Sequence, residues 1–468
     1  MATWQASDIL KALGLVASPS DFEATGISID TRTLKPGEIF VAIKGETCDG
    51  HNFIEDAFAK GAACVVVSQP VPELKTESYF LVDDTLEALK AFGSYARLQT
   101  EAKVIAITGS VGKTTTKQWL SQVLASFGKT AFSPESYNNC LGVPLSLSTL
   151  ERDANFGVFE VGMNNPGEIA PLSTLVQPDI AIITNIAESH IGRLGSLEKI
   201  ALEKSEIFKG LKAGGTVVLN QDAPQFDLLK RIATNKGIKN IITVGKAKEA
   251  DVILLDCKET PSDYTSTITA EIKSKKVQYQ LSLIGEHYAL TSLFVLACVD
   301  HLGLSLEKAI QTLSTLKPFR GRGLRQKVTL LNGNTITLID DAYNANPASM
   351  KAGLTVLKSL STKSKKIAVL GEMLELGQNT GEYHRNLINE VKSSGVDVVF
   401  AAGAGMQSLF EDLPDALKGK FEKEAKALVP HVTSAIQDGD IVFVKGSKGS
   451  KVSLVVDYLL SQPSTAAA

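Results

Sequence analysis

A chain of 468 residues is too long for one ordinary core and predicts about three domains, because domains usually contain roughly 100–200 residues. Its net charge of −3, with 21% charged residues, gives no indication of a nucleic-acid or membrane-surface partner. No apolar run approaches the roughly 20 residues of a membrane span. The N-terminus lacks a secretory signal, and the five cysteines have no spacing typical of a zinc site. We therefore expect a cytoplasmic protein with free thiols.

The first block, residues 1–84, is predicted to contain apolar strands around a short helix. The strands are expected at 37–43 and 62–67, and the helix at 52–61 lies between them. A further short strand is expected at 79–82. This order predicts a small N-terminal α/β domain.

The second block, residues 85–316, alternates buried strands with helices. Apolar residues at helical spacing predict one helix at 113–127. Alternating residues at 277–283 indicate a hairpin-like insertion. Fully apolar strands are expected at 104–107, 156–161, 180–184 and 216–219. Such strands, separated by helices, predict a central parallel sheet that is covered on both faces.

The third block, residues 317–468, follows a linker with proline and glycine at 317–323. Its strands are expected at 335–339, 367–370, 396–401 and 441–444, with helices between them. This pattern predicts a C-terminal Rossmann-like domain. Glycine follows several of these strands, and open α/β sheets bind ligands at the carboxyl ends of their strands.

Residues 108–115 (TGSVGKTT) lie between a predicted strand and a predicted helix, as a phosphate loop would. Gly109 and Gly112 allow backbone N–H groups to turn toward an anion, and the helix N-terminus adds a favourable dipole. Lys113 would reach the outer phosphates and Thr114 would bind Mg²⁺. The predicted nucleotide-binding residues are Gly109, Ser110, Val111, Gly112, Lys113, Thr114 and Thr115.

The loop departs from the full GxxxxGK[ST] pattern, because Ile107 stands where the first glycine is expected. The loop instead fits the shorter form TGxxGKTT. By itself it indicates a nucleotide and leaves a switch GTPase, an ATPase and a ligase as candidates.

Four more segments match a known family: 160–169 (EVGMNNPGEI), 340–347 (DDAYNANP), 371–377 (GEMLELG) and 444–447 (VKGS). Together with the loop at 108–115, and in the same order, they resemble the Mur ligases, the amide-forming enzymes of bacterial cell-wall synthesis. The similarity covers nearly the whole chain. It is greatest to the members that add D-alanyl-D-alanine to UDP-N-acetylmuramoyl-tripeptide.

The resemblance implies an ATP-dependent ligase of peptidoglycan precursor synthesis that forms ADP and phosphate. A carboxylate must be activated before an amide can form, so an acyl phosphate is expected as the intermediate. The partners would be the uridine-linked tripeptide and D-alanyl-D-alanine, and we expect a monomer. The sibling ligase that adds the third stem-peptide residue is the alternative, although the DNPR motif that would favour it is absent from the sequence.

The resemblance also assigns metal and catalytic residues. Two Mg²⁺ ions are expected, with Thr114, Glu160, His190 and Lys204 as the metal-binding residues. Lys204 would be carbamylated, which replaces its positive charge by oxygen ligands. Arg322, in the linker, would contact the terminal phosphates when the domains close. The predicted catalytic residues are Lys113, Lys204, His190 and Arg322.

Further positions would bind the rest of the substrates. Asp341 and Asn344 match family residues on the nucleotide. The predicted substrate-binding residues are Asp30, Thr31, Arg32, Lys44 and His51 for the uridine diphosphate, Asn138 and Asn139 for the muramoyl end, and Lys445 and Ser447 for the dipeptide or acyl group.

Three positions depart from the family pattern. Gly192 stands where a glutamate often follows the histidine, and Tyr288 and Thr291 replace two asparagines near the adenine. Stacking of Tyr288 on the base is one hypothesis. Two other functions are disfavoured: a folylpolyglutamate synthase lacks a uridine-binding first block, and a nucleotide-gated protein without catalysis would not need the metal residues.

Overall fold

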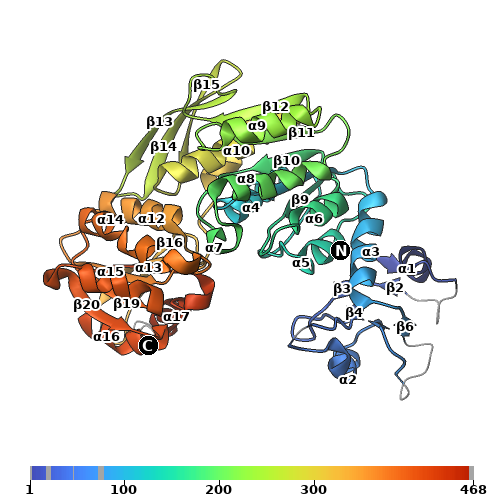
Figure 1. The fold of residues 1–468 in the computed structure, drawn as a ribbon, viewed down its shortest axis with the longest axis horizontal. Coiled ribbons are helices and arrows are strands. Elements are labelled where there is room, and N and C mark those ends of the chain that lie inside the picture. Colours follow the sequence, from blue (N-terminus) through green and yellow to red (C-terminus); the bar gives the residue numbers. More distant parts are fainter. Residues whose placement is uncertain (1–2, 17–22, 46, 72–78, 463–468) are drawn as a thin grey trace.

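The computed structural model describes residues 3–16, 23–45, 47–71 and 79–462. Besides a two-stranded sheet near the N-terminus, its strands form sheets of four, nine and six strands. We call the parts built on these sheets the N-terminal, central and C-terminal domains. The central domain lies between the other two (Figure 1).

The N-terminal domain is a small parallel sheet with strand order β3-β4-β5-β6. Its predicted strands and helix are confirmed, and α2 connects β4 to β5. The elements are β1 (Trp4–Gln5), α1 (Ala6–Leu13), β2 (Glu23–Ala24), β3 (Gly26–Ser28), β4 (Glu38–Val41), η1 (Gly50–Phe53), α2 (Ile54–Ala59), β5 (Cys64–Val67) and β6 (Tyr79–Leu81).

Helix α3 (Thr85–Leu98) joins the N-terminal and central domains. The carboxylate of Asp84 caps it by accepting from two backbone N–H groups of the first turn. Near its other end, the buried guanidinium of Arg97 donates to the carbonyls of Val176 and Gln177, both at 2.9 Å. These bonds fix α3 to the central domain.

The central sheet has the strand order β15-β14-β13-β12-β11-β10-β7-β9-β8. Neighbours from β8 to β13 are parallel, and β13, β14 and β15 are antiparallel. The predicted parallel sheet and its hairpin-like extension are therefore confirmed. The strands are β7 (Lys103–Thr108), β8 (Thr130–Phe132), β9 (Phe156–Glu160), β10 (Ile180–Ile183), β11 (Thr216–Asn220), β12 (Asn240–Gly245), β13 (Val252–Thr260), β14 (Thr265–Ile272) and β15 (Lys275–Leu281).

Helices cover this sheet. They are α4 (Lys113–Ala125), α5 (Gly142–Leu147), α6 (Ile169–Val176), α7 (Ile191–Leu194), α8 (Leu197–Ser205) with η3 (Glu206–Lys209), α9 (Phe226–Asn235), α10 (Glu286–His301) and α11 (Leu306–Thr315). Strand β7 leads into α4 and lies between β9 and β10, where the chain order of the sheet reverses. Such a switch point is where open α/β sheets bind ligands, so the 108–115 loop lies at the expected place.

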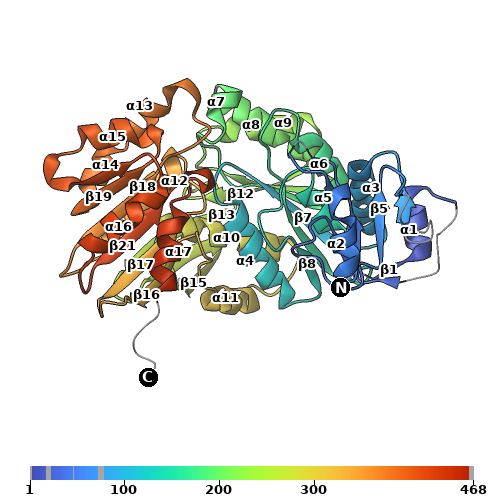
Figure 2. The same ribbon diagram turned by 90° about the horizontal axis from the view of Figure 1, so that it is seen from below.

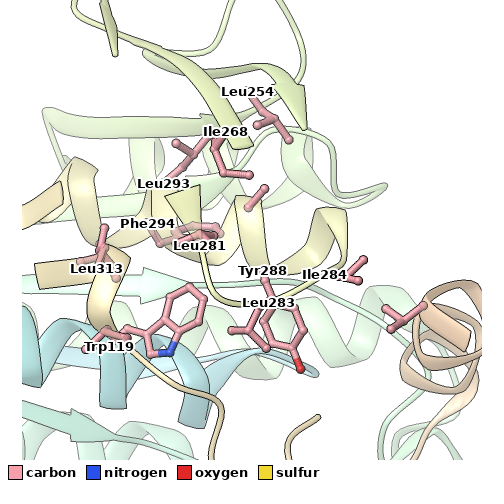
Figure 3. Close-up of a cluster of buried hydrophobic side chains, with 14 of the residues drawn as sticks. Trp119, Leu254, Ile268, Leu281, Leu283, Ile284, Tyr288, Leu293, Phe294 and Leu313 are labelled. Atoms are coloured by element: carbon pink, nitrogen blue, oxygen red, sulfur yellow. The ribbon is translucent and has the colours of Figure 1, made fainter. Parts of the chain in front are cut away.

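An apolar core joins α10, α4 and the β13–β15 extension (Figure 3). Trp119 of α4 is 1% exposed and stacks on Tyr288 of α10, with ring centroids 6.0 Å apart. Burying a side chain of this size contributes about 3 kcal/mol. The core therefore holds the helix that follows the phosphate loop.

The C-terminal sheet has the order β16-β17-β21-β18-β19-β20, parallel except for the edge strand β16. This confirms the expected open α/β sheet. Its strands are β16 (Leu324–Thr329), β17 (Thr335–Asp341), β18 (Lys366–Gly371), β19 (Val398–Ala402), β20 (Lys418–Glu422) and β21 (Ile441–Lys445). Its helices are α12 (Pro347–Ser359), η4 (Gly377–Asn379), α13 (Thr380–Arg385), α14 (Ile388–Ser393), η5 (Ala404–Met406), α15 (Gln407–Asp412), η6 (Asp415–Leu417), α16 (Ala425–Ala435), η7 (Lys448–Ser450) and α17 (Ser453–Ser461).

All five cysteines are free thiols, as expected from their spacing. Within the described part of the chain, each helix is too short or too polar to cross a lipid bilayer.

Candidate active site

The phosphate loop depends on its two glycines. Gly109 and Gly112 have φ angles of 146° and 86°, which side-chain-bearing residues rarely adopt. A Cβ at Gly109 would lie 2.0 Å from Oγ1 of Thr184. That hydroxyl donates to the carbonyl of Val111 at 2.6 Å, so the end of β10 braces the loop.

Lys113 begins α4, directly after the loop. Its Nζ donates to the carbonyl of Gly109 at 2.8 Å, which places the amine over the loop. Its position deep in the cleft lowers the pKa of Lys113, and the nearby carboxylate of Glu160 opposes that shift. The loop therefore combines a cation with the N-terminal end of a 13-residue helix, and both attract phosphate.

Thr114 and Glu160 meet at the ends of α4 and β9. Oγ1 of Thr114 donates to Oε2 of Glu160 at 2.8 Å, and Nδ2 of Asn138 donates to Oε1 at 2.7 Å. The hydroxyl of Ser136 lies 3.1 Å from that of Thr114. Glu160 is 1% exposed, so a buried carboxylate with neutral partners stands beside the phosphate loop.

The sequence did not single out Lys117. Its side chain is fully buried, and Nζ donates to the carbonyls of Ser133 and Glu135 at 2.5 and 2.7 Å. Burial lowers the pKa of Lys117 to about 8. Lys117 thereby shapes the turn that presents Ser136 and Asn138. It lies one helical turn after Lys113, a spacing that could have identified it.

Lys204 lies near the end of α8 and is 1% exposed. Burial, and then the positive charge of Lys113, hold the pKa of Lys204 well below its usual range. The carboxylate of Glu160, another predicted metal-binding residue, partly opposes this lowering of the pKa of Lys204. The structure thus brings Lys204 to the same side of the site as Lys113 and Glu160.

His190 immediately precedes α7 and faces the C-terminal domain. Its Nδ1 lies 2.5 Å from Oε2 of Glu375, and this contact lowers the pKa of Glu375. Glu375 belongs to the GEMLELG segment but was not among the predicted site residues.

Arg322 reaches from the linker into the central domain. Its Nη2 donates to Oγ1 of Thr114 at 3.1 Å, and its guanidinium carbon lies 4.2 Å from the ring centroid of Tyr343. The hydroxyl of Tyr288 donates to the carbonyl of Arg322 at 2.9 Å. Arg322 is therefore held from both domains.

The Tyr288 contacts weigh against stacking on the base. The ring is 9% exposed and packs against Trp119 and His287, whose centroids lie 6.0 and 4.0 Å away. Its hydroxyl already holds Arg322. Tyr288 thus serves as a support for the linker, and Thr291 bonds to a backbone carbonyl one turn earlier in α10.

A cavity of about 350 Å³ lies between the central and C-terminal domains. It brings together predicted residues that are far apart in sequence: the residues 110–115, Asn138, Glu160, Arg322, Asp341, Asn344 and Lys445 all line it. His287, Tyr288, Leu290, Thr291 and Phe294 of α10 line it as well, and His287, Leu290 and Phe294 were not among the predicted site residues.

Lys445 and Ser447 connect two segments of the C-terminal domain. Nζ of Lys445 donates to Oδ2 of Asp341 at 2.6 Å and to the carbonyl of Asn344 at 3.1 Å. Oγ of Ser447 donates to the carbonyl of Ala345 and accepts from the N–H of Leu374. Both residues are almost fully buried, and in this structure they stabilise the segments that form the wall of the cavity.

The predicted uridine-binding residues lie in the N-terminal domain, away from this cavity. Arg32 pairs with Asp30, and the exposed guanidinium remains open to solvent. His51 is different, because Nδ1 contacts Asp49 at 2.6 Å and Nε2 accepts from the N–H of Ser68 at 3.0 Å. Both ring nitrogens are therefore used within the fold.

The remaining two positions in this group, Thr31 and Lys44, have local partners, and so does Asn139 of the predicted muramoyl site. Lys44 forms an isolated bridge with Asp49 through the backbone, and the carbonyl of Thr31 accepts from Lys60. Oδ1 of Asn139 accepts from the N–H of Gly142 at 2.9 Å, at the start of α5. Asn139 thus stabilises a local turn before this helix.

The donor set fits magnesium bound together with phosphate. Mg²⁺ prefers hard oxygen ligands and commonly uses one or two carboxylates plus substrate phosphates. The hydroxyl of Thr114 and the carboxylate of Glu160 provide such oxygens. Among the described residues, no three His, Cys, Asp or Glu side chains converge on one point, so protein side chains of these types alone form no complete cage there.

Family models match all three parts of the chain. They are described as "Mur ligase family, catalytic domain" for residues 23–96, "Mur ligase middle domain" for 107–299 and "Mur ligase, glutamate ligase domain" for 325–448. The UDP-N-acetylmuramoyl-tripeptide–D-alanyl-D-alanine ligase of Rickettsia prowazekii is 33% identical over 97% of this chain and 99% of its own length.

Solved structures agree. MurF from Acinetobacter baumannii has a TM-score of 0.84 at 28% identity, covering 98% of this chain and 99% of its own. MurF ligase from Thermotoga maritima, in complex with ADP, has a TM-score of 0.77 at 25% identity, covering 93% of this chain and 97% of its own. The chain belongs to the Mur ligase family.

Proposed function

We propose that this enzyme joins D-alanyl-D-alanine to UDP-N-acetylmuramoyl-tripeptide, with ATP converted to ADP and phosphate. The observation that carries the proposal is the interdomain cavity, where a phosphate loop, a buried carboxylate and an arginine from a second domain meet. The full-length relative from Rickettsia prowazekii carries this activity in its name. The reaction belongs to peptidoglycan precursor synthesis, and the free cysteines fit a cytoplasmic enzyme.

The chemistry begins with the carboxylate of the tripeptide, which attacks the γ-phosphorus of ATP to give an acyl phosphate and ADP. The amine of the dipeptide then attacks the acyl carbon, loses a proton and expels phosphate. Anions approach one another in both steps, so Lys113 and Arg322 act by placing positive charge around the phosphates. Bound Mg²⁺ supplies further charge neutralisation, and Thr114 and Glu160 would hold it.

The carboxylate oxygen lost in the second step gives a direct test. Tripeptide labelled with ¹⁸O in its terminal carboxylate should transfer one ¹⁸O to the released phosphate, as measured by mass spectrometry. The same samples should contain a product heavier than the labelled tripeptide by one dipeptide less one ¹⁸O-labelled water. Unlabelled phosphate alongside that product would contradict the acyl-phosphate route.

Carbamylation of Lys204 is part of the proposal. An amine reacts with CO₂ only when unprotonated, and burial lowers the pKa of Lys204 well below its usual range. The nitrogen lone pair forms the N–C bond, one C=O electron pair moves to oxygen, and the amine proton passes to water. The oxygen atoms of the resulting carbamate, together with His190, would hold a second Mg²⁺.

A carbon-13 experiment tests the modification. Enzyme equilibrated with ¹³C-bicarbonate should show one carbamate carbon resonance that a Lys204→Arg variant lacks. Lys212, an ordinary lysine in the loop before β11, gives the control, because Lys212→Arg should keep the resonance. A spectrum without the resonance in the wild-type enzyme would contradict the carbamate.

The remaining predicted contacts complete the proposal. Asp341 and Asn344 bind the nucleotide in the cavity, Arg32 binds the uridine diphosphate and Asn138 contacts the muramoyl end of the substrate. The enzyme acts as a monomer, which light scattering of the purified protein tests.

The sibling ligase that adds the third stem residue makes a different prediction. It would consume the uridine-linked dipeptide with lysine or diaminopimelate in place of D-alanyl-D-alanine. The same mass-spectrometric assay, supplied with those substrates, should detect no product.

A further inference from the structure

Two residues with strained backbones face each other across the boundary between the central and C-terminal domains. His190 and Glu375 have φ angles of 60° and 66°, in the left-handed region that residues with a side chain rarely occupy. Nδ1 of the first lies 2.5 Å from Oε2 of the second. Such strain persists only where the surrounding structure enforces it, and it is concentrated at functional sites.

Contacts from three directions enforce the position of Glu375. The N–H of the preceding Leu374 donates to Oγ of Ser447 at 3.0 Å, within the C-terminal domain. The carbonyl of Glu375 accepts from the N–H of Gly192 at 3.0 Å, across the boundary. Nη2 of Arg193 lies 3.8 Å from the remaining carboxylate oxygen. The carboxylate is therefore aimed at His190 by both domains.

Two glycines let the domains come this close. A Cβ on Gly192 would lie 2.4 Å from the backbone nitrogen of Gly377 and 2.6 Å from its Cα. Backbone atoms cannot give way, so any side chain at 192, including the glutamate frequent in the family, would separate the two segments. Figure 2 shows α7, which contains Gly192, beside the C-terminal domain near α13.

The contact also determines which ring nitrogen of His190 is free. Nδ1 lies 2.5 Å from the Glu375 carboxylate, although the two side chains are not aligned as a regular hydrogen bond, and Nε2 has no hydrogen-bond partner among the described residues. A histidine that binds a metal through one nitrogen commonly donates its other N–H to a carboxylate, which fixes the ring. Glu375 is placed to be that carboxylate.

We propose that Glu375 is a positioning residue for His190, and that it acts only when the Gly192–Gly377 contact has closed the C-terminal domain onto the central domain. This inference rests on the proposed function, in which His190 is a metal-binding residue. Glu375 thereby adds a residue of the C-terminal domain to the metal site. The second metal position then depends on closure of this domain onto the central domain.

The first test measures metal binding without turnover. Mn²⁺ serves as the probe, and its affinity is measured by electron paramagnetic resonance in the presence of ADP. Glu375→Gln keeps the size of the side chain and removes its charge, so it should weaken the closure-dependent Mn²⁺ site by about 10–100-fold. Glu382→Gln, an exposed glutamate on α13, is the matched control and should bind Mn²⁺ like the wild type.

The second test measures closure. Gly192 has an ordinary negative φ, so Gly192→Ala should fold normally and disturb only the closed state. Small-angle scattering with Mg²⁺ and ADP should show compaction of the wild type and of Gly381→Ala, whose added Cβ meets only Ser408 at 3.5 Å. Gly192→Ala should stay expanded. It should lower kcat more than it changes the KM for ATP.

Equal Mn²⁺ affinity in the wild type and Glu375→Gln would overturn the positioning role, and normal compaction of Gly192→Ala would overturn its dependence on closure. Thermal unfolding of both variants shows that they fold. Neither measurement contains a peptide substrate. A wild-type enzyme that compacts and binds Mn²⁺ but forms no peptide product would therefore refute the proposed reaction and leave this inference standing.

Discussion

At the scale of single residues, the hydroxyl of Thr114 connects the elements of the site. It donates to Glu160 and accepts from Arg322, and Ser136 lies at 3.1 Å. Each of these neighbours comes from a different segment of the chain. The position of this one oxygen therefore reports on the phosphate loop, the end of β9 and the linker together.

Removing that oxygen should impair catalysis more than folding. Thr114→Val keeps the shape of the side chain and should lower kcat by about 100-fold, because a magnesium ligand is lost. Thr114→Ser retains the hydroxyl and should remain within about tenfold of the wild type. Phosphate release at several Mg²⁺ concentrations measures both. Equal activity of the valine and serine variants would show that the hydroxyl has no such role.

The buried Lys117 leads to a prediction about pH. Burial lowers its pKa to about 8 in the folded protein, against roughly 10.4 for an exposed lysine. Between these values the unfolded chain binds more protons, so the free energy of unfolding should rise with pH in this window.

Chemical denaturation between pH 7 and 10 tests this prediction. The stability of the wild type relative to Lys117→Met should increase above about pH 8 and be constant below it. A difference between the two proteins that does not change with pH would contradict the shifted pKa.

At the scale of elements, the sequence predicted the strands and helices whose own residues carry a clear hydrophobic pattern. The apolar strand before residues 108–115 and the amphipathic helix after them are seen as β7 and α4. The sequence did not predict β8, which has three residues, or the polar edge strand β16. Strand β8 exists through pairing with β9, and β16 forms a hairpin with the following strand, β17. Such pairing leaves little periodicity in a short or polar segment.

Helix α12 begins at a cap that also lines the cavity. Oδ1 of Asn346 accepts from the N–H of Ser349 at 2.8 Å, and Oγ of Ser349 accepts from the N–H of Asn346 at 3.0 Å. Asn346→Ala should reduce stability by about 1 kcal/mol and also lower activity, because the cavity wall moves.

The control is Ser305, which caps α11 away from the cavity by accepting from the N–H of Lys308. Ser305→Ala should show a similar loss of stability with unchanged kcat. Urea denaturation and phosphate release, measured on both variants, distinguish the two effects. Full activity in Asn346→Ala would show that the helix cap does not contribute to the active site.

At the scale of the whole molecule, the site exists only where domains meet. The sequence assigned Arg322 and His190 through family motifs, but it could not show that Arg322 contacts Thr114, 208 positions earlier. Nor could it identify Glu375, whose role depends on the close approach of Gly192 and Gly377. The sequence assigned His51 to the uridine diphosphate, but it could not show that the two ring nitrogens contact Asp49 and Ser68. Such outcomes depend on tertiary geometry.

Closure makes Arg322 more important for turnover than for binding. Arg322→Met should lower kcat by about 10³-fold, as expected for an arginine that neutralises a transferring phosphoryl group. Its effect on the KM for ATP should be smaller, because the phosphate loop belongs to the central domain. Arg322→Lys keeps the charge without the contact to the Tyr343 ring and should be intermediate. Steady-state kinetics with ATP as the varied substrate compares the wild type with both variants. A change confined to the KM for ATP would contradict this role of Arg322.

The central claim is that ATP hydrolysis is coupled to the addition of D-alanyl-D-alanine. Phosphate release by the wild-type enzyme, measured with ATP, Mg²⁺ and UDP-N-acetylmuramoyl-tripeptide, with and without the dipeptide, tests this claim most directly. We predict rapid release only in the complete mixture. Turnover that stays the same when D-alanyl-D-alanine is omitted would contradict the account.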